Sequence, residues 1–293
     1  YQKGVYINQS FENLNLERPH LVKNIHQEFL RAGAELLRTN TFSANALKLA
    51  PYGLGEKVRE INIAGVRLAR EAASGTAWIA GVVGPPGRTV EGDPAALPMA
   101  KLLEVYRVQL EALIEAGVDL FLFESFAHLP TVSALMDLAA KLAPETPRVV
   151  MLRFSLDALP FDYSAATVAA EIALLRADVI GVNEGATPAP LVETLAALKA
   201  ATSAPLAFFP GAGQPILHED RFLHMATPEY FMEWIRKGMY NGARLLGGAS
   251  GCSPEHIKAI KGSIRMLQPG ATPPATGTAP EDKVGVPEMK VFE

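Results

Sequence analysis

The stretch MAKLLEVYRVQLEALIEAGVDLFLFES, residues 99–125, carries the pattern that decides the fold. Its first part, 99–116, is rich in Leu, Ala and Glu and predicts a helix. Its second part, 120–125, is a short apolar run typical of a strand buried on both faces of a parallel sheet. Similar strand-like runs recur along the chain at 35–42, 78–85, 148–155, 179–184, 204–211 and 244–250. Strand–helix units repeated in this way indicate right-handed βαβ crossovers.

Two features favour a (β/α)8 TIM barrel over a doubly wound sheet, and the expected fold class is therefore α/β. The units continue along most of the chain without the change of composition that would mark a second domain. Small and polar residues also gather at the expected carboxyl ends of the strands. In barrel enzymes these ends carry the active site.

The pattern yields seven strands, one fewer than a closed barrel of this kind needs. We expect the first strand to lie upstream of Tyr1 and to be missing from this sequence, unless another segment fills its place. The segment 284–293 is a poor substitute, because its internal Pro287 cannot donate to a strand ladder. We therefore expect residues 1–268 to form the barrel and residues 269–293, rich in Pro, Thr and Ala, to form a linker or tail.

Composition limits the partners and the compartment. The 293 residues carry a net charge of −4, which argues against nucleic acid or an anionic membrane surface as the main partner. No apolar run reaches the length of about 18 residues that a membrane span needs. The single cysteine excludes an internal disulfide and a multi-cysteine zinc site, and it is compatible with a cytoplasmic location.

Six motifs give the chain a resemblance to a known family. They are LRTNTFSAN (37–45), AGVVGPPG (80–87), LFESF (122–126), GVNEG (181–185), FFPGAGQP (208–215) and GGASGCSPEHI (247–257). In this order and spacing they resemble the homocysteine S-methyltransferases, a family that includes betaine-homocysteine methyltransferase and the homocysteine domain of cobalamin-dependent methionine synthase. The resemblance covers about residues 13–264 and implies a (β/α)8 barrel that transfers a methyl group to sulfur.

The resemblance also implies a zinc ion held by three cysteines, but this sequence departs from that pattern. The positions of the three cysteine ligands are occupied by Glu184, Ala249 and Ser250, and the only cysteine, Cys252, stands where the family has a threonine. Alanine offers no ligand and serine is a poor one for zinc. We therefore predict no metal site at these positions, no other cofactor, and loss of the zinc activation that turns a thiol into a thiolate.

The candidate site residues lie at the expected strand ends. The resemblance implies that Glu124 binds the amino group of homocysteine; the alternative is a structural ion pair. Asn183, Thr41, Asn40 and the neighbouring Ser125 are candidates for orienting the substrate. For Asn183, Asn40 and Thr41, the alternative is that they fasten the strand ends.

Glu184 is the candidate catalytic residue. A carboxylate there could accept the proton of a neutral thiol or contact a cation, and the alternative is a solvated side chain on the rim. Cys252 is more readily interpreted as a small half-buried residue than as a nucleophile. His218, Asp220 and His224 lie together in what we expect to be a loop. They could form a replacement metal site, although their spacing matches no zinc motif.

Three functional hypotheses follow. The first is methyl transfer to the sulfur of a homocysteine-like substrate. The second is a zinc-less, non-catalytic binding or scaffold domain of a larger methyl-transfer protein. The third is a related enzyme that uses Glu184 on a non-thiol substrate such as an amine or a sulfonium. The expected partners are a small amino-acid-like substrate and a methyl donor, with a further domain or a homodimer left open.

Overall fold

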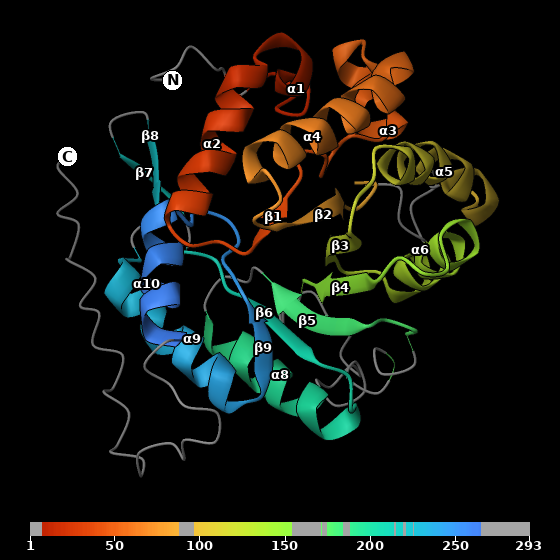
Figure 1. The fold of residues 1–293 in the computed structure, drawn as a ribbon. Helices are drawn as coiled ribbons and strands as arrows, with labels where there is room; N and C mark the ends of the chain where they lie inside the picture. Colours follow the sequence, from red (N-terminus) through yellow and green to blue (C-terminus); the bar gives the residue numbers. More distant parts are fainter. Residues whose placement is uncertain are drawn as a thin grey trace, which may run out of the picture.

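The computed structural model describes residues 8–87, 97–153, 171, 175–183, 188–213, 215–218, 221–224 and 226–264. Seven parallel strands form one curled sheet in the order β1-β2-β3-β4-β5-β6-β9. They are β1 (Leu36–Arg38), β2 (Trp78–Val83), β3 (Leu120–Phe126), β4 (Arg148–Leu152), β5 (Val179–Asn183), β6 (Leu206–Phe209) and β9 (Ala243–Leu246). In Figure 1 these strands form the wall of an incomplete barrel with helices outside it, so the fold is of the predicted TIM-barrel type.

The helices connect successive strands, as parallel neighbours require. The α-helices are α1 (Leu14–Glu17), α2 (Pro19–Arg31), α3 (Ala46–Leu49), α4 (Val58–Ala73), α5 (Met99–Glu115), α6 (Leu129–Leu142), α8 (Pro188–Ala201), α9 (Pro228–Tyr240) and α10 (Pro254–Ile264). Two 3-10 helices, η1 (Ala50–Tyr52) and η2 (Gly55–Lys57), precede α4. Helix α9 begins at Pro228 because Thr227 accepts a hydrogen bond from the Tyr230 amide and a proline follows it.

Strands β1 and β9 are the two edges of the curled sheet, and they do not pair with each other. An eighth strand of a closed barrel would lie between them. Across this seam the described chain is joined through its helices: the Lys261 ammonium on α10 bonds the Glu35 carboxylate just before β1. The alkyl stem of Lys261 also packs over Gly33 at the end of α2.

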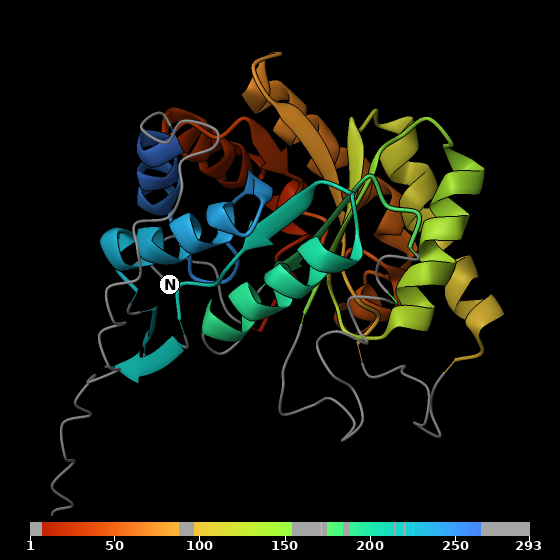
Figure 2. The same ribbon diagram turned by 90° about the horizontal axis from the view of Figure 1, so that it is seen from below.

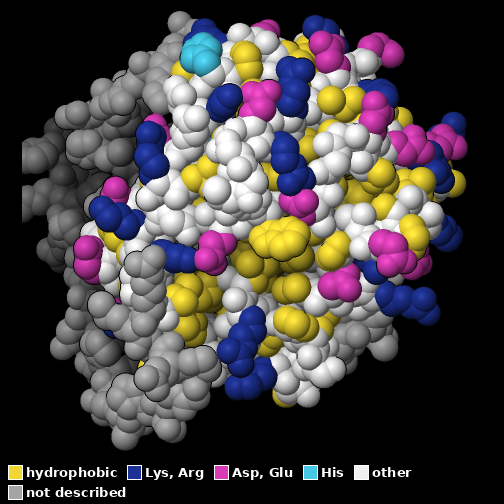
Figure 3. All heavy atoms as spheres, in the orientation of Figure 1, with side chains coloured by type: hydrophobic (Ala, Val, Ile, Leu, Met, Phe, Trp, Pro, Cys, Tyr) yellow, Lys and Arg dark blue, Asp and Glu magenta, His cyan; other side chains and the backbone are white. Residues whose placement is uncertain are grey.

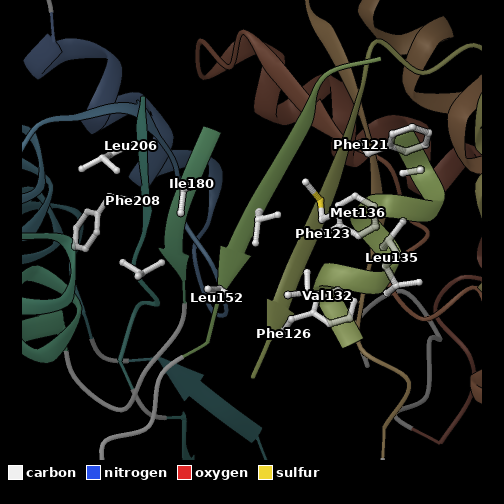
Figure 4. Close-up of a cluster of buried hydrophobic side chains, with 14 of the residues drawn as sticks. Phe121, Phe123, Phe126, Val132, Leu135, Met136, Leu152, Ile180, Leu206 and Phe208 are labelled. Atoms are coloured by element: carbon white, nitrogen blue, oxygen red, sulfur yellow. The ribbon is translucent and has the colours of Figure 1, made fainter. Parts of the chain in front are cut away.

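Each strand has one apolar face toward the helices and one toward the barrel interior. The outward face builds the main core, in which Phe121 and Phe123 of β3 pack with Val132, Leu135 and Met136 of α6 (Figure 4). The inward face is filled by apolar residues from four strands, β2, β3, β4 and β6: Ala80, Val82, Leu122, Val149, Met151, Ala207 and Phe209. This inner cluster fills the barrel interior, so polar groups are left to the carboxyl ends of the strands.

The segment after β6 is a correction to the sequence interpretation. It was expected to be a loop, but β7 (Pro215–His218) and β8 (Arg221–His224) form an antiparallel hairpin. The hairpin lies outside the barrel wall (Figure 2). A pairing of only four residues per strand, separate from the main sheet, has too little hydrophobic periodicity to be recognised from sequence.

Two predicted strands are shorter than expected. The run 35–42 forms a strand only at β1, and the run 244–250 only at β9, because side-chain and loop hydrogen bonds take over at their carboxyl ends. The predicted tail 269–293 lies outside the described residues. None of the described helices is long and apolar enough to cross a membrane. On the face shown in Figure 3, acidic and basic side chains are interspersed around apolar ones, so this face carries no broad patch of one charge.

Candidate functional site

A bulge at the end of β3 turns two consecutive residues toward the barrel mouth. The pairing of β3 with β4 changes register between Phe123 and Phe126. Within this bulge Ser125 has a φ of 64°, a left-handed conformation that is strained for a residue with a side chain. Because of the bulge, Glu124 and Ser125 both meet the side chain of Asn183, whereas a regular strand would point them to opposite faces.

Asn183, at the end of β5, joins these two residues. Its amide Nδ2 donates to Ser125 Oγ at 2.8 Å and to Glu124 Oε1 at 3.3 Å. The residue is fully buried, and its other polar atom, Oδ1, has no hydrogen-bond partner among the described residues. The structure thus brings together Glu124, Ser125 and Asn183, three of the candidate residues named from the sequence.

Arg38 belongs to the same cluster and was missed by sequence reasoning. From β1 its guanidinium Nη1 pairs with Glu124 Oε1, and its Nη2 donates to the Gly248 carbonyl at 2.9 Å. The guanidinium carbon lies 5.8 Å from the centre of the Phe209 ring, within the range of a cation–π contact. The signal was an arginine inside an otherwise apolar strand, where a charged side chain needs a partner.

The pairing of Glu124 matters for its expected role. Its side chain is 9% exposed, so the carboxylate is nearly buried, and Arg38 supplies the opposite charge that such a group requires. The ion pair that was the alternative interpretation of Glu124 is therefore present. It uses one carboxylate oxygen, Oε1, which also accepts the Asn183 bond.

Thr41 and Asn40 have partners within the fold. The Thr41 hydroxyl is fully buried and donates to the Val82 carbonyl at 2.8 Å, while its oxygen lies 2.7 Å from the Thr39 hydroxyl. Asn40 donates to the Phe11 carbonyl at 2.8 Å and to Asn15 Oδ1 at 3.0 Å. Both residues fasten the end of β1 to its neighbours, which is the alternative considered for them.

The loop that follows β9 contains two of the positions where the family resemblance implies metal ligands. Ala249 donates its amide to the Pro210 carbonyl at 2.9 Å, and the Ser250 carbonyl accepts from the Ala212 amide at 2.9 Å. The Cys252 thiol is directed at the Pro210 carbonyl, 3.6 Å away, and packs against Gly248. Burial raises the pKa of the Cys252 thiol to about 12, although the nearby charge of Arg38 acts in the opposite direction. Cys252 is thus a protonated, half-buried packing residue.

The histidine candidates do not assemble a metal site in the described chain. His224 Nδ1 lies 2.9 Å from the Gly213 carbonyl, and its ring packs directly over the backbone of Gly251. The side chain of His218 and the residues Asp220 and Glu184 lie outside the described part of the chain. No three His, Cys, Asp or Glu side chains come close enough to hold one metal ion among the residues that the structure describes.

An incomplete barrel of parallel strands, with polar side chains gathered where those strands end, defines an α/β-barrel protein, and in barrel enzymes these strand ends carry the active site. The model of the homocysteine S-methyltransferase family matches residues 3–264, and the chain belongs to that family.

Solved structures show the same fold. The oxidised form of the homocysteine methyltransferase MmuM from Escherichia coli is 23% identical, with a TM-score of 0.74; 89% of this chain and 91% of that chain are covered. Its metallated form is 24% identical over the same shares, with a TM-score of 0.72. At these identities the comparison establishes the architecture of this chain.

The three-cysteine zinc site that the resemblance implies does not fit the described residues. Of its positions, Ala249 has no side-chain donor atom, and the one sulfur nearby, on Cys252, is directed at the Pro210 carbonyl. The nearby carboxylate of Glu124 is paired with Arg38, so its Oε1 is already engaged. The described residues therefore do not provide the three-cysteine site.

Proposed function

We propose that this protein binds a homocysteine-like amino acid at the mouth of its barrel and transfers a methyl group to the sulfur without three-cysteine zinc activation. The observation that carries the proposal is the cluster of Arg38, Glu124, Ser125 and Asn183, which lies at the carboxyl ends of the strands in a member of the homocysteine S-methyltransferase family. In barrels, side chains at this position face the ligand.

In the proposed reaction, Glu124 and Asn183 hold the amino group of the substrate. Each has an oxygen to offer, because neither Glu124 Oε2 nor Asn183 Oδ1 has a hydrogen-bond partner among the described residues. Ser125 supports this arrangement through Asn183, and Asn40 and Thr41 hold the neighbouring strand end. Glu184 takes the proton from the thiol while the sulfur–methyl bond forms and the bond between the methyl group and its donor breaks.

Methionine formation from homocysteine tests the proposal. The full chain is incubated with homocysteine and, in turn, a sulfonium donor (S-methylmethionine), a quaternary ammonium donor (glycine betaine) and 5-methyltetrahydrofolate, and methionine is measured by mass spectrometry. We expect turnover with one donor, no zinc by elemental analysis, and loss of at least tenfold in kcat for Glu184→Ala. Glu193→Ala, an exposed carboxylate on α8, is the matched control. Full activity in Glu184→Ala would remove Glu184 from the reaction.

A second candidate function is ligand binding without catalysis. The observation that favours it is the donor-poor loop after β9, where Ala249 and Ser250 stand at two expected ligand positions. Binding of homocysteine or a folate, measured by calorimetry, with no methionine from any donor, would support this candidate. Activity on an amine or sulfonium in place of homocysteine would instead support the non-thiol enzyme.

A further inference from the structure

Arg38 has hydrogen-bonding capacity that the fold leaves unused. A guanidinium carries five N–H donors in a rigid plane. Two of them are engaged, by Glu124 Oε1 and the Gly248 carbonyl, which leaves three without a partner among the described residues. The side chain is 36% exposed, so these donors can be reached from the mouth of the barrel.

Asn183 offers the complementary group, a hydrogen-bond acceptor that the fold leaves unpaired. Its Oδ1 is an acceptor that is fully buried and unpaired in the described chain. An unpaired buried acceptor is unfavourable, and a ligand that donates a hydrogen bond to it removes that cost. The Asn183 side chain cannot turn over to satisfy Oδ1 elsewhere, because its Nδ2 is already committed to Ser125 and Glu124.

The unused donors of Arg38 and the unpaired acceptor of Asn183 belong to side chains that both bond a single atom, Glu124 Oε1. Glu124 Oε1 accepts from both Arg38 Nη1 and Asn183 Nδ2, so the free donors and the free acceptor belong to side chains that meet at one carboxylate oxygen. The contact with Phe209 and the bond to Gly248 fix the plane of the guanidinium. A planar donor group held in this way suits the two oxygens of a carboxylate.

We infer that Arg38 is a specificity-determining residue that recognises the anionic group of the ligand, and that the ligand is a small carboxylate with an N–H donor for Asn183 Oδ1. The inference rests on the proposed function only in placing the ligand at the barrel mouth. Glu124 compensates the charge of Arg38 within the fold, and the carboxylate of the ligand takes up the donors that Glu124 leaves free.

Binding to fragments of homocysteine tests this inference. Calorimetry on the full chain uses L-homocysteine, 4-sulfanylbutanoate (no amino group), 3-aminopropane-1-thiol (no carboxylate) and butanoate. Two variants change Arg38: Arg38→Lys keeps the charge but loses the planar donor group, and the double variant Arg38→Gln with Glu124→Gln removes both charges, so that no buried charge is left unpaired. Arg59→Gln is the control, because Arg59 pairs with Glu115 on the exposed outer surface.

We expect the two thiols that carry a carboxylate, L-homocysteine and 4-sulfanylbutanoate, to bind the wild-type protein at least tenfold more tightly than 3-aminopropane-1-thiol. Both Arg38 variants should lose at least tenfold for 4-sulfanylbutanoate, and Arg59→Gln should lose nothing. Unchanged binding of 4-sulfanylbutanoate in folded Arg38 variants, or no carboxylate binding to the wild-type protein, overturns it. Arg38-dependent binding of L-homocysteine without methionine formation from any of the three donors would refute the proposed function and leave this inference standing.

Discussion

The reactivity of Cys252 offers a sharp test of the site, because the chain has no other cysteine. Burial raises the pKa of its thiol from 9.0 to about 12. At neutral pH a rise of three units lowers the thiolate fraction roughly a thousandfold, since only the thiolate reacts. A thiolate of higher pKa is intrinsically more nucleophilic, which recovers roughly 20-fold. We therefore expect alkylation of the folded protein to be slower by about 50-fold or more.

The assay compares iodoacetamide labelling of the same thiol in folded protein and in protein unfolded with urea, at pH 7.5, with the product quantified by intact mass. The folded rate should rise about tenfold per pH unit from pH 7.5 to 10, whereas the unfolded rate should begin to level off above pH 9, the ordinary pKa of the thiol. Arg38→Met should slow the folded reaction further, because the charge of Arg38 lowers the pKa of the thiol. A folded rate within fivefold of the unfolded rate at pH 7.5 would refute the reasoning and make Cys252 a candidate nucleophile.

Three further predictions concern stability, measured as the free energy of unfolding in urea. Ser125→Gly and Ser125→Ala both lose the hydrogen bond from Asn183, but only glycine adopts the φ of 64° without strain. Ser125→Gly should therefore be more stable than Ser125→Ala by about 1 kcal/mol. Equal stabilities of the two variants would mean that the bulge is unstrained. Gly181→Ala would place its Cβ 2.3 Å from the Ala207 carbonyl oxygen, and it should lower the free energy of unfolding by about 3 kcal/mol or more. Gly262→Ala has open space around it in helix α10, and it should raise the free energy of unfolding by about 0.5–1 kcal/mol. The pKa of His26 is lowered to about 4 by burial, so the unfolded chain binds the proton more readily. Stability should then fall as the pH drops from 6.5 toward 4, by up to about 3 kcal/mol, and His26→Gln should lose this part of the slope.

The sequence was sufficient to predict the barrel, because each buried parallel strand can be recognised locally as a short apolar run. The run 120–125 lies within strand β3, which ends at Phe126, and Glu124 lies near its carboxyl end as expected. By contrast, the strand at 35–42 was predicted too long. Its last residues are polar groups held by partners on α1, β2 and the segment before α1, and such long-range hydrogen bonds have no local pattern.

The site was predicted in part, for a similar reason. Glu124, Ser125 and Asn183 were identified from strand ends, where any polar residue of a barrel is a candidate. Arg38 stands within the quoted motif LRTNTFSAN, yet its importance depends on Glu124 and Gly248, which lie 86 and 210 positions away along the chain. Pairings over such distances are decided by the curl of the sheet.

Arg38 also has a mechanical consequence. The edge strands β1 and β9 share no backbone ladder, but the bond from Arg38 to the Gly248 carbonyl spans the seam between them at the barrel mouth. The Arg38 side chain, which contacts the ligand in the proposed site, therefore also links the two edge strands of the sheet. A ligand that pulls the guanidinium toward itself weakens the bond from Arg38 to the Gly248 carbonyl. A ligand that leaves the guanidinium in place strengthens this bond. By thermodynamic reciprocity, occupancy of the mouth and opening of the seam are linked, so backbone amides of β1 and β9 report on a ligand they do not touch.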